Sequence, residues 1–117
     1  MAGVIILSGQ EDASNTDILE GTRLQTAPSR GMITFELQAS DNDATNNYTA
    51  TVQLPSGDTP MESVRVPGTD TAGLAGILKT ENKLMATFPI AQGGHVVFSV
   101  AETGDAELTW RVTFTPA

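Results

Sequence analysis

Cysteine is absent from this chain of 117 residues. Without cysteine there is no disulfide framework, no thiolate nucleophile and no cysteine-based zinc site. The sequence therefore predicts a protein that gains its stability from packing or from assembly. It predicts neither a metal centre nor an organic cofactor.

Basic residues are scarce, with six Lys and Arg against fourteen Asp and Glu and a net charge of −8. The six are scattered along the chain, so they form no basic stripe of the kind that follows a duplex. An acidic chain of this kind is not attracted to phosphate backbones or to anionic lipid. We therefore expect no nucleic acid and no membrane among its partners.

Long apolar runs are missing as well. The stretch nearest the start spans only residues 4–7, and no positively charged segment precedes it. It is too short to cross a bilayer and lacks the features of a signal peptide. Synthesis in a cytoplasm without export is the expectation.

The residues that are plentiful favour strands and turns. The chain holds 16 Thr, 7 Ser, 11 Gly and 6 Pro, with 39% hydrophobic and only 17% charged residues. This supplies a core, and it is the composition of β-branched strands joined by tight turns. We expect one all-β domain over residues 1–117, because this length suits one domain.

Alternation of apolar and polar side chains locates the strands. The clearest case is the segment 108–115, in which Leu108, Trp110, Val112 and Phe114 face one way. Similar alternation predicts strands over 32–39, 48–54, 84–90 and 95–101, with shorter ones over 4–8, 22–26 and 63–66. Pro89 marks the 84–90 segment as an edge strand or a strand end.

About eight short strands separated by Gly, Pro, Asn and Asp turns predict an antiparallel β-sandwich with a jelly-roll-like arrangement. The strands over 95–101 and 108–115 are expected to pair through the Gly-Asp turn between them. The strands over 32–39 and 48–54, joined by a polar loop, are expected to repeat that arrangement.

No catalytic motif emerges from the sequence, and we expect a protein that is not an enzyme. The single histidine, His95, follows Gly93 and Gly94 at the start of a strand, where a local packing or capping role accounts for it. A hydrolase would need His95 beside Ser or Asp in a cleft. The glycine pair is expected to form a tight turn.

The loop over residues 41–47 offers several side-chain oxygens at close spacing. It lacks the glycine and the bidentate glutamate that an EF-hand requires, so a solvated loop is the default interpretation. A looser calcium site keeps one alternative function open, namely a calcium-dependent or carbohydrate-binding adhesion module. Four of the six aromatic residues face inward in the predicted strands, which gives a sugar-binding platform little support.

Several short segments, distributed over most of the chain, are similar to sequences found in one class of proteins. They are residues 21–28 (GTRLQTAP), 53–60 (QLPSGDTP), 64–68 (VRVPG) with 72–76 (AGLAG), and 88–95 (FPIAQGGH) leading into 109–116 (TWRVTFTP). In these segments the sequence resembles small virion structural proteins of tailed bacterial viruses. The resemblance implies a decoration or cement protein that binds the outside of a capsid, made in the host cytoplasm and located in the virion.

The implied partners are the major capsid protein and further copies of the chain, with a trimer favoured. Two segments are apolar or rich in small residues where a solvated loop would be polar, namely 2–7 and 69–76. We expect them to supply contact residues. These are Val4, Ile5, Ile6, Leu7, Ala72, Leu74 and Ala75.

Overall fold

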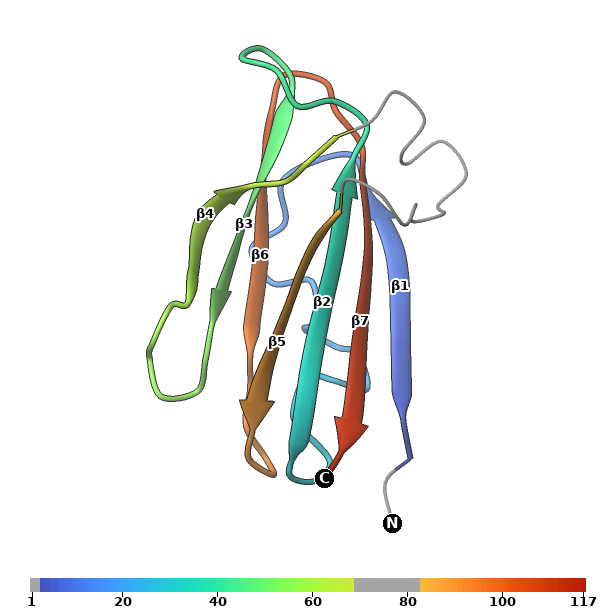
Figure 1. Ribbon diagram of the computed structural model, residues 1–117, viewed down its shortest axis with the longest axis vertical. Coiled ribbons are helices and arrows are strands. Elements are labelled where there is room, and N and C mark those ends of the chain that lie inside the picture. Colours follow the sequence, from blue (N-terminus) through green and yellow to red (C-terminus); the bar gives the residue numbers. More distant parts are fainter. Residues whose placement is uncertain (1–2, 69–82) are drawn as a thin grey trace.

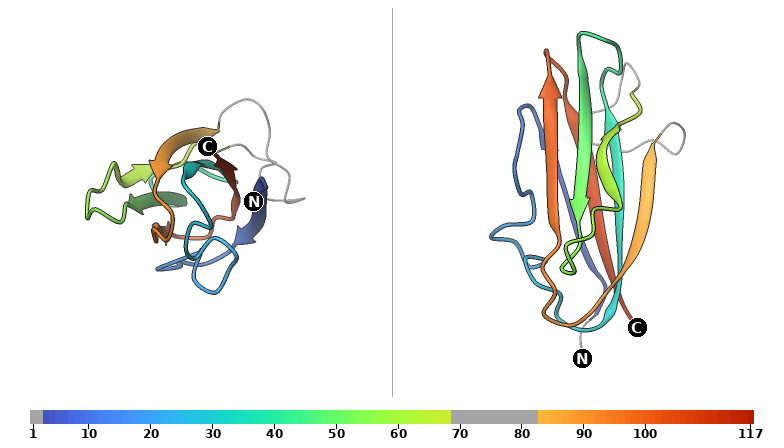
Figure 2. Two further views of the ribbon diagram at one scale, coloured as in Figure 1. Left: turned by 90° about the horizontal axis from the view of Figure 1, so that it is seen from below. Right: turned by 90° about the vertical axis from the view of Figure 1, so that its left-hand side faces the viewer.

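The computed structural model describes residues 3–68 and 83–117, and these form two stacked antiparallel sheets without a helix (Figures 1 and 2). One sheet has four strands in the order β1-β7-β2-β5, and the other has three in the order β4-β3-β6. The strands are β1 (Ile5–Glu11), β2 (Gly31–Ala39), β3 (Asn47–Gln53), β4 (Met61–Arg65), β5 (Leu84–Ile90), β6 (Val97–Thr103) and β7 (Leu108–Pro116).

In place of the eighth strand expected from the sequence, a short segment pairs with β6 through a few backbone hydrogen bonds. Residues 15–18 run along the free side of β6, where Asn15 exchanges backbone hydrogen bonds of 3.0 and 2.9 Å with Val100, and the Ile18 N–H donates to the Phe98 carbonyl. If this segment is counted as a strand, each sheet has four members. Every connection except β3 to β4 then crosses between the sheets, which is the jelly-roll arrangement expected from the sequence.

Two of the predicted pairings are wrong. β6 and β7 are consecutive, yet β6 pairs with β3 and β7 pairs with β1 and β2. β2 and β3 are likewise in different sheets. Alternation shows that a segment is a half-buried strand, but both sheets of a sandwich have the same alternation, so it does not assign a strand to a sheet.

The predicted strand over 22–26 is also wrong, because this segment forms turns. Thr22 donates to the Leu19 carbonyl through both its N–H and its Oγ1, and the Gln25 N–H donates to the Thr22 carbonyl. Leu19 and Leu24 are nevertheless buried in the core. Local side-chain to backbone bonds of this kind compete with strand formation in Thr-rich segments.

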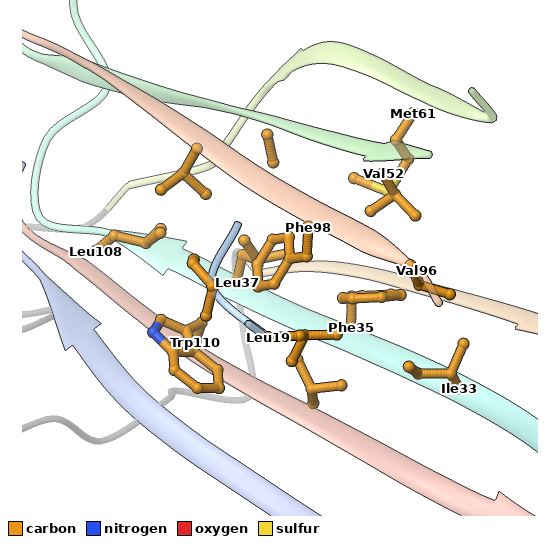
Figure 3. Packing of buried hydrophobic residues seen from close by; sticks show 14 of the residues in the cluster. Leu19, Ile33, Phe35, Leu37, Val52, Met61, Val96, Phe98, Leu108 and Trp110 are labelled. Atoms are coloured by element: carbon orange, nitrogen blue, oxygen red, sulfur yellow. The ribbon is translucent and has the colours of Figure 1, made fainter. Parts of the chain in front are cut away.

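The core lies between the two sheets and joins them through aromatic rings (Figure 3). Phe98 of β6 has its ring centroid 5.0 Å from that of Phe35 in β2 and 6.3 Å from that of Trp110 in β7. Gly9 of β1 gives Trp110 its space, because a Cβ at Gly9 would lie 2.8 Å from the indole ring. Phe35, Tyr48, Trp110 and Phe114 are all buried, as their alternation predicted.

Candidate functional site

The large hydrophobic side chains that remain exposed in the described residues share one surface. They are Val4, Ile6, Met32 and Met85, with 58, 56, 42 and 60% of their surface accessible. Ile6, Met32 and Met85 point outward from β1, β2 and β5, and Val4 precedes β1 with the same parity as Ile6. All four therefore belong to the outer face of the four-stranded sheet.

The strand register arranges this outer face in rows. One row crosses the sheet through Ile6, Thr113, Thr34 and Thr87. Thr34 and Thr87 share a hydroxyl hydrogen bond of 2.9 Å. The row nearer the chain termini contains Thr115, Met32 and Pro89. These two rows carry no charged side chain, although the chain as a whole has a charge of −8.

The next row crosses the sheet through Ser8, Arg111, Glu36 and Met85, and its one carboxylate contacts two cations. Glu36 receives two hydrogen bonds from Arg111, from Nε at 3.0 Å and from Nη2 at 2.7 Å, and a third from Lys83 Nζ at 2.6 Å. The hydrogen bonds from Arg111, followed by those from Lys83, lower the pKa of Glu36 to about 2 despite its burial. The triad therefore borders the uncharged rows with an ionised carboxylate held between two cations, and its net charge is positive.

Replacing Glu36 with glutamine is expected to remove a pH-dependent part of the stability. The wild-type carboxyl has a pKa near 4.5 unfolded and about 2 folded. Its contribution is therefore complete above pH 4.5 and is lost as the pH falls towards 2. Urea unfolding should show Glu36→Gln less stable at pH 7, on the order of 2 kcal/mol, with a smaller deficit at pH 3.

Glu62→Gln is the matched control for this prediction, because Glu62 is exposed on β4 and its side chain makes no hydrogen bond or ion pair with the described residues. It should leave the unfolding free energy near that of the wild type at both pH values. An unchanged deficit of Glu36→Gln between pH 7 and pH 3 would contradict the ion-triad assignment.

The predicted contact residues near the N-terminus differ in exposure, because alternate residues of a strand face opposite sides of the sheet. Val4 and Ile6 are exposed on the outer face, whereas Ile5 and Leu7 are half-buried and pack against the core. Only the first pair offers side chains to a partner in this structure. The other predicted contact residues, Ala72, Leu74 and Ala75, lie outside the described residues.

In the loop over residues 41–47, one of the two acidic side chains, Asp43, is hydrogen-bonded within the loop. Asp43 Oδ1 accepts hydrogen bonds from the Thr45 N–H, the Thr45 hydroxyl and the Asn46 N–H, all within 2.9 Å. The backbone N–H groups of Asn46 and Thr45 lower the pKa of Asp43. In the described ranges no three His, Cys, Asp or Glu side chains are placed to hold a metal ion.

The His95 side chain contacts the segment between β1 and β2 through both of its ring nitrogens. Its Nε2 lies 3.1 Å from Asp17 Oδ2, and its Nδ1 contacts the Gln25 carbonyl oxygen. Next to it, Ala27 and the Gly93–Gly94 turn exchange backbone hydrogen bonds. Asp17 is one of the two residue types that a hydrolase would need beside His95. Within the part of the chain that is described, however, the ring makes no hydrogen bond to a hydroxyl, and its second nitrogen contacts a backbone carbonyl. The geometry supports the local packing role.

Acidic residues at the end of β1 and just before β7 surround a small polar pocket. A hollow of about 250 Å³ is lined by Gln10, Glu11, Asp12 and Glu107. The Glu11 carboxylate accepts from Asn15 Nδ2 at 2.9 Å and from Trp110 Nε1 at 3.4 Å. Glu11 therefore orients the loop and the indole.

Exposed rings that could stack on a sugar are absent from the sheet faces. The six aromatic residues are the four Phe, one Tyr and one Trp, and all lie in described positions. Phe88 is partly buried against the core, and the other five are buried.

No described helix is long and apolar enough to span a membrane.

Comparison with known proteins identifies the fold but no family. The sequence matches no protein-family model and no curated protein. Among solved structures, the chain is similar to one in the acidic stable capsid structure of Helicobacter pylori bacteriophage KHP30, with a TM-score of 0.56 and 14% identity over 99% of this chain and 90% of that one. This likeness supports the β-sandwich fold.

Carbohydrate-binding modules show a more distant likeness. One from Cellvibrio mixtus lichenase 5A, in complex with cellotriose, has a TM-score of 0.42 and 15% identity over 93% of this chain and 91% of that one. A xylan-binding domain from Paenibacillus barcinonensis Xyn10C has a TM-score of 0.39 and 13% identity over 98% and 87%.

Proposed function

We propose that this chain is a non-enzymatic virion structural protein that decorates or cements the outside of a capsid. The outer face of the four-stranded sheet is its contact with the major capsid protein. The proposal rests mainly on one observation, the two uncharged rows with exposed Ile6 and Met32, next to exposed Met85, on a chain of charge −8. Exposed apolar surface gathered on one face is typical of a protein contact.

Three further observations support a capsid as the partner. The sequence segments resemble virion structural proteins, and the fold is similar to a chain in a phage capsid structure. An acidic surface also suits the exterior of a shell better than contact with packaged DNA.

The physical role follows from mass action. A protein that binds the assembled lattice, and binds its dissociated parts less well, shifts the equilibrium towards the shell. The chain would bury its two uncharged rows, with Met85 beside them, at capsomer joints and leave its exposed acidic side chains in solvent. The chain is then made in the host cytoplasm and located in the virion, and the segment containing Ala72, Leu74 and Ala75 remains a second proposed contact.

Co-sedimentation tests the proposal. Capsid shells of the virus that encodes the chain, assembled without it, are mixed with purified wild-type or variant chain and pelleted. Met32→Glu places a charge in an uncharged row of the outer face, and burying that charge without a partner should weaken binding about tenfold or more. Ala101→Glu adds the same charge to an exposed position on β6, in the other sheet.

Ala101→Glu should bind like the wild type, and both variants should keep the wild-type circular dichroism and melting temperature. The proposal is overturned if the wild-type chain stays in the supernatant at every concentration. If the chain pellets but Ala101→Glu weakens binding as much as Met32→Glu does, the outer face is not the contact.

A further inference from the structure

Three of the four sheet edges are blocked against pairing with another strand. β4 is irregular, because a register shift opposite β3 puts Ser63 at a φ of 49°. β5 carries Pro89, which lacks an N–H. The free side of β6 is already bonded to residues 15–18. A bulge, a proline and a covering segment are the usual devices by which proteins close sheet edges.

The fourth edge, β1, has none of these devices. It holds seven consecutive register pairs with β7, without a shift, and in the described residues β7 is its only strand neighbour. Its sequence IILSGQE contains no proline, lysine or arginine. Its side chains alternate between half-buried and exposed along the whole length. β1 therefore presents a regular open edge.

The sequence around this edge is self-complementary. Residues 3–9 read GVIILSG, which is nearly symmetrical about Ile6. An antiparallel pairing with a second copy, centred on Ile6, sets Gly3 opposite Gly9, Val4 opposite Ser8 and Ile5 opposite Leu7. A twofold contact requires a self-complementary segment, because the same residues form both sides of the contact.

We propose that β1 pairs with β1 of a second copy of this chain, in antiparallel register about Ile6. Charge favours a second copy as the occupant. The paired segment 3–9 has no ionisable side chain, and the first acids, Glu11 and Asp12, fall beyond it. Two chains of charge −8 therefore meet along a neutral strip, while Ile6 packs on Ile6 at the axis.

This pairing changes the expected assembly. The two four-stranded sheets join into one continuous sheet across a twofold axis, which gives a dimer rather than the trimer expected from the sequence. The outer faces of both copies then lie on the same side of that sheet. The inference concerns only the contact of the chain with itself, so it stands or falls independently of the capsid proposal.

Cysteine crosslinking tests the pairing directly, because the wild-type chain has no cysteine. Ile6→Cys places two thiols opposite each other at the axis, at a Cα separation of about 4.5–5.5 Å, which a disulfide can span. Met85→Cys is the matched control, since Met85 is equally exposed on the same face but lies on the other edge strand. Under mild oxidation Ile6→Cys should form disulfide dimer at least about tenfold faster.

A mixed reaction tests the register. Val4→Cys and Ser8→Cys chains, mixed in equal amounts, should form the mixed disulfide in preference to either homodimer. Light scattering on the wild-type chain should give a mass that rises from one copy towards two with concentration. A monomer at all concentrations, a trimer, or equal crosslinking of Ile6→Cys and Met85→Cys would overturn the inference.

Discussion

Replacing Phe98 with alanine is expected to lower the free energy of unfolding by about 3–5 kcal/mol. The ring is fully buried, and it contacts Phe35 and Trp110 of the opposite sheet at centroid distances of 5.0 and 6.3 Å. Truncation removes the transfer free energy of the ring, leaves a cavity between the sheets and breaks two aromatic pairs. Small domains have only about 5–15 kcal/mol of stability in total, so this is a large loss.

Val97→Ala is the control for this prediction. Val97 is the neighbouring residue of β6, points out of the sandwich and is half-buried. Its truncation should cost about 1 kcal/mol or less, and both variants are compared by urea unfolding at neutral pH. Equal losses for the two variants would contradict a core joined through Phe98.

Replacing Gly104 with alanine should cost at least about 2 kcal/mol. Gly104 has a φ of 69°, a left-handed conformation that glycine adopts without steric cost. A Cβ at this position would lie 1.9 Å from the Thr45 carbonyl oxygen, so the two loops at this end of the sandwich would have to separate. The same loops are joined by the Asp105 N–H, which donates to Asn46 Oδ1 at 2.8 Å.

Gly57 separates the effect of conformation from the effect of the close contact. It has a φ of 95°, but a Cβ there would meet no atom within 4 Å. Gly57→Ala should therefore lose only the conformational part, about 1 kcal/mol, in thermal or urea unfolding. A Gly104→Ala protein no less stable than Gly57→Ala would show that the loops do not approach each other closely.

Strand positions followed from the sequence where one face is buried. The segment 84–90 forms β5 with the predicted limits, and β7 extends the predicted 108–115 by only one residue. Pro89 correctly marked an edge, because β5 has only β2 as a strand neighbour among the described residues. The side-chain period of two is set locally by the pleat, so a single segment is enough to reveal it.

Pairing could not be predicted in the same way. The turn between β6 and β7 contains Gly104 and Asp105, as a hairpin connection would, yet it joins strands of different sheets. A short connection can close a hairpin or cross a sandwich, and the choice depends on which strands fill the places on either side. The 15–18 segment escaped detection because it pairs with β6 over only a few residues.

The candidate surface was partly visible in the sequence. Val4 and Ile6 belong to the segment expected to make contacts, and both are exposed. Met32 was missed, although it shares its parity with Thr34 and Glu36 and is an apolar residue on an otherwise polar face. The Glu36–Arg111 ion pair could not be predicted from the sequence, because it joins residues 75 positions apart through a register that only the folded sheet defines.

The outer face and the β1 edge act together in this account. The edge would join two chains through backbone pairing, and the face would bind the lattice through side chains. Ile6 belongs to both surfaces, whereas Met32 and Met85 belong only to the face. The two methionines therefore report on lattice contact separately from contact between copies.

Methionine oxidation of the free and the capsid-bound chain tests the central claim most directly. Met32 and Met85 are 42 and 60% exposed, and Met61 is only 5% exposed and serves as the internal reference. In the free chain, peroxide should convert Met32 and Met85 to sulfoxide much faster than Met61. On the capsid, both should become several-fold slower. If Met32 and Met85 oxidise at the free-chain rate while the chain is bound, the outer face is not the surface that meets the capsid.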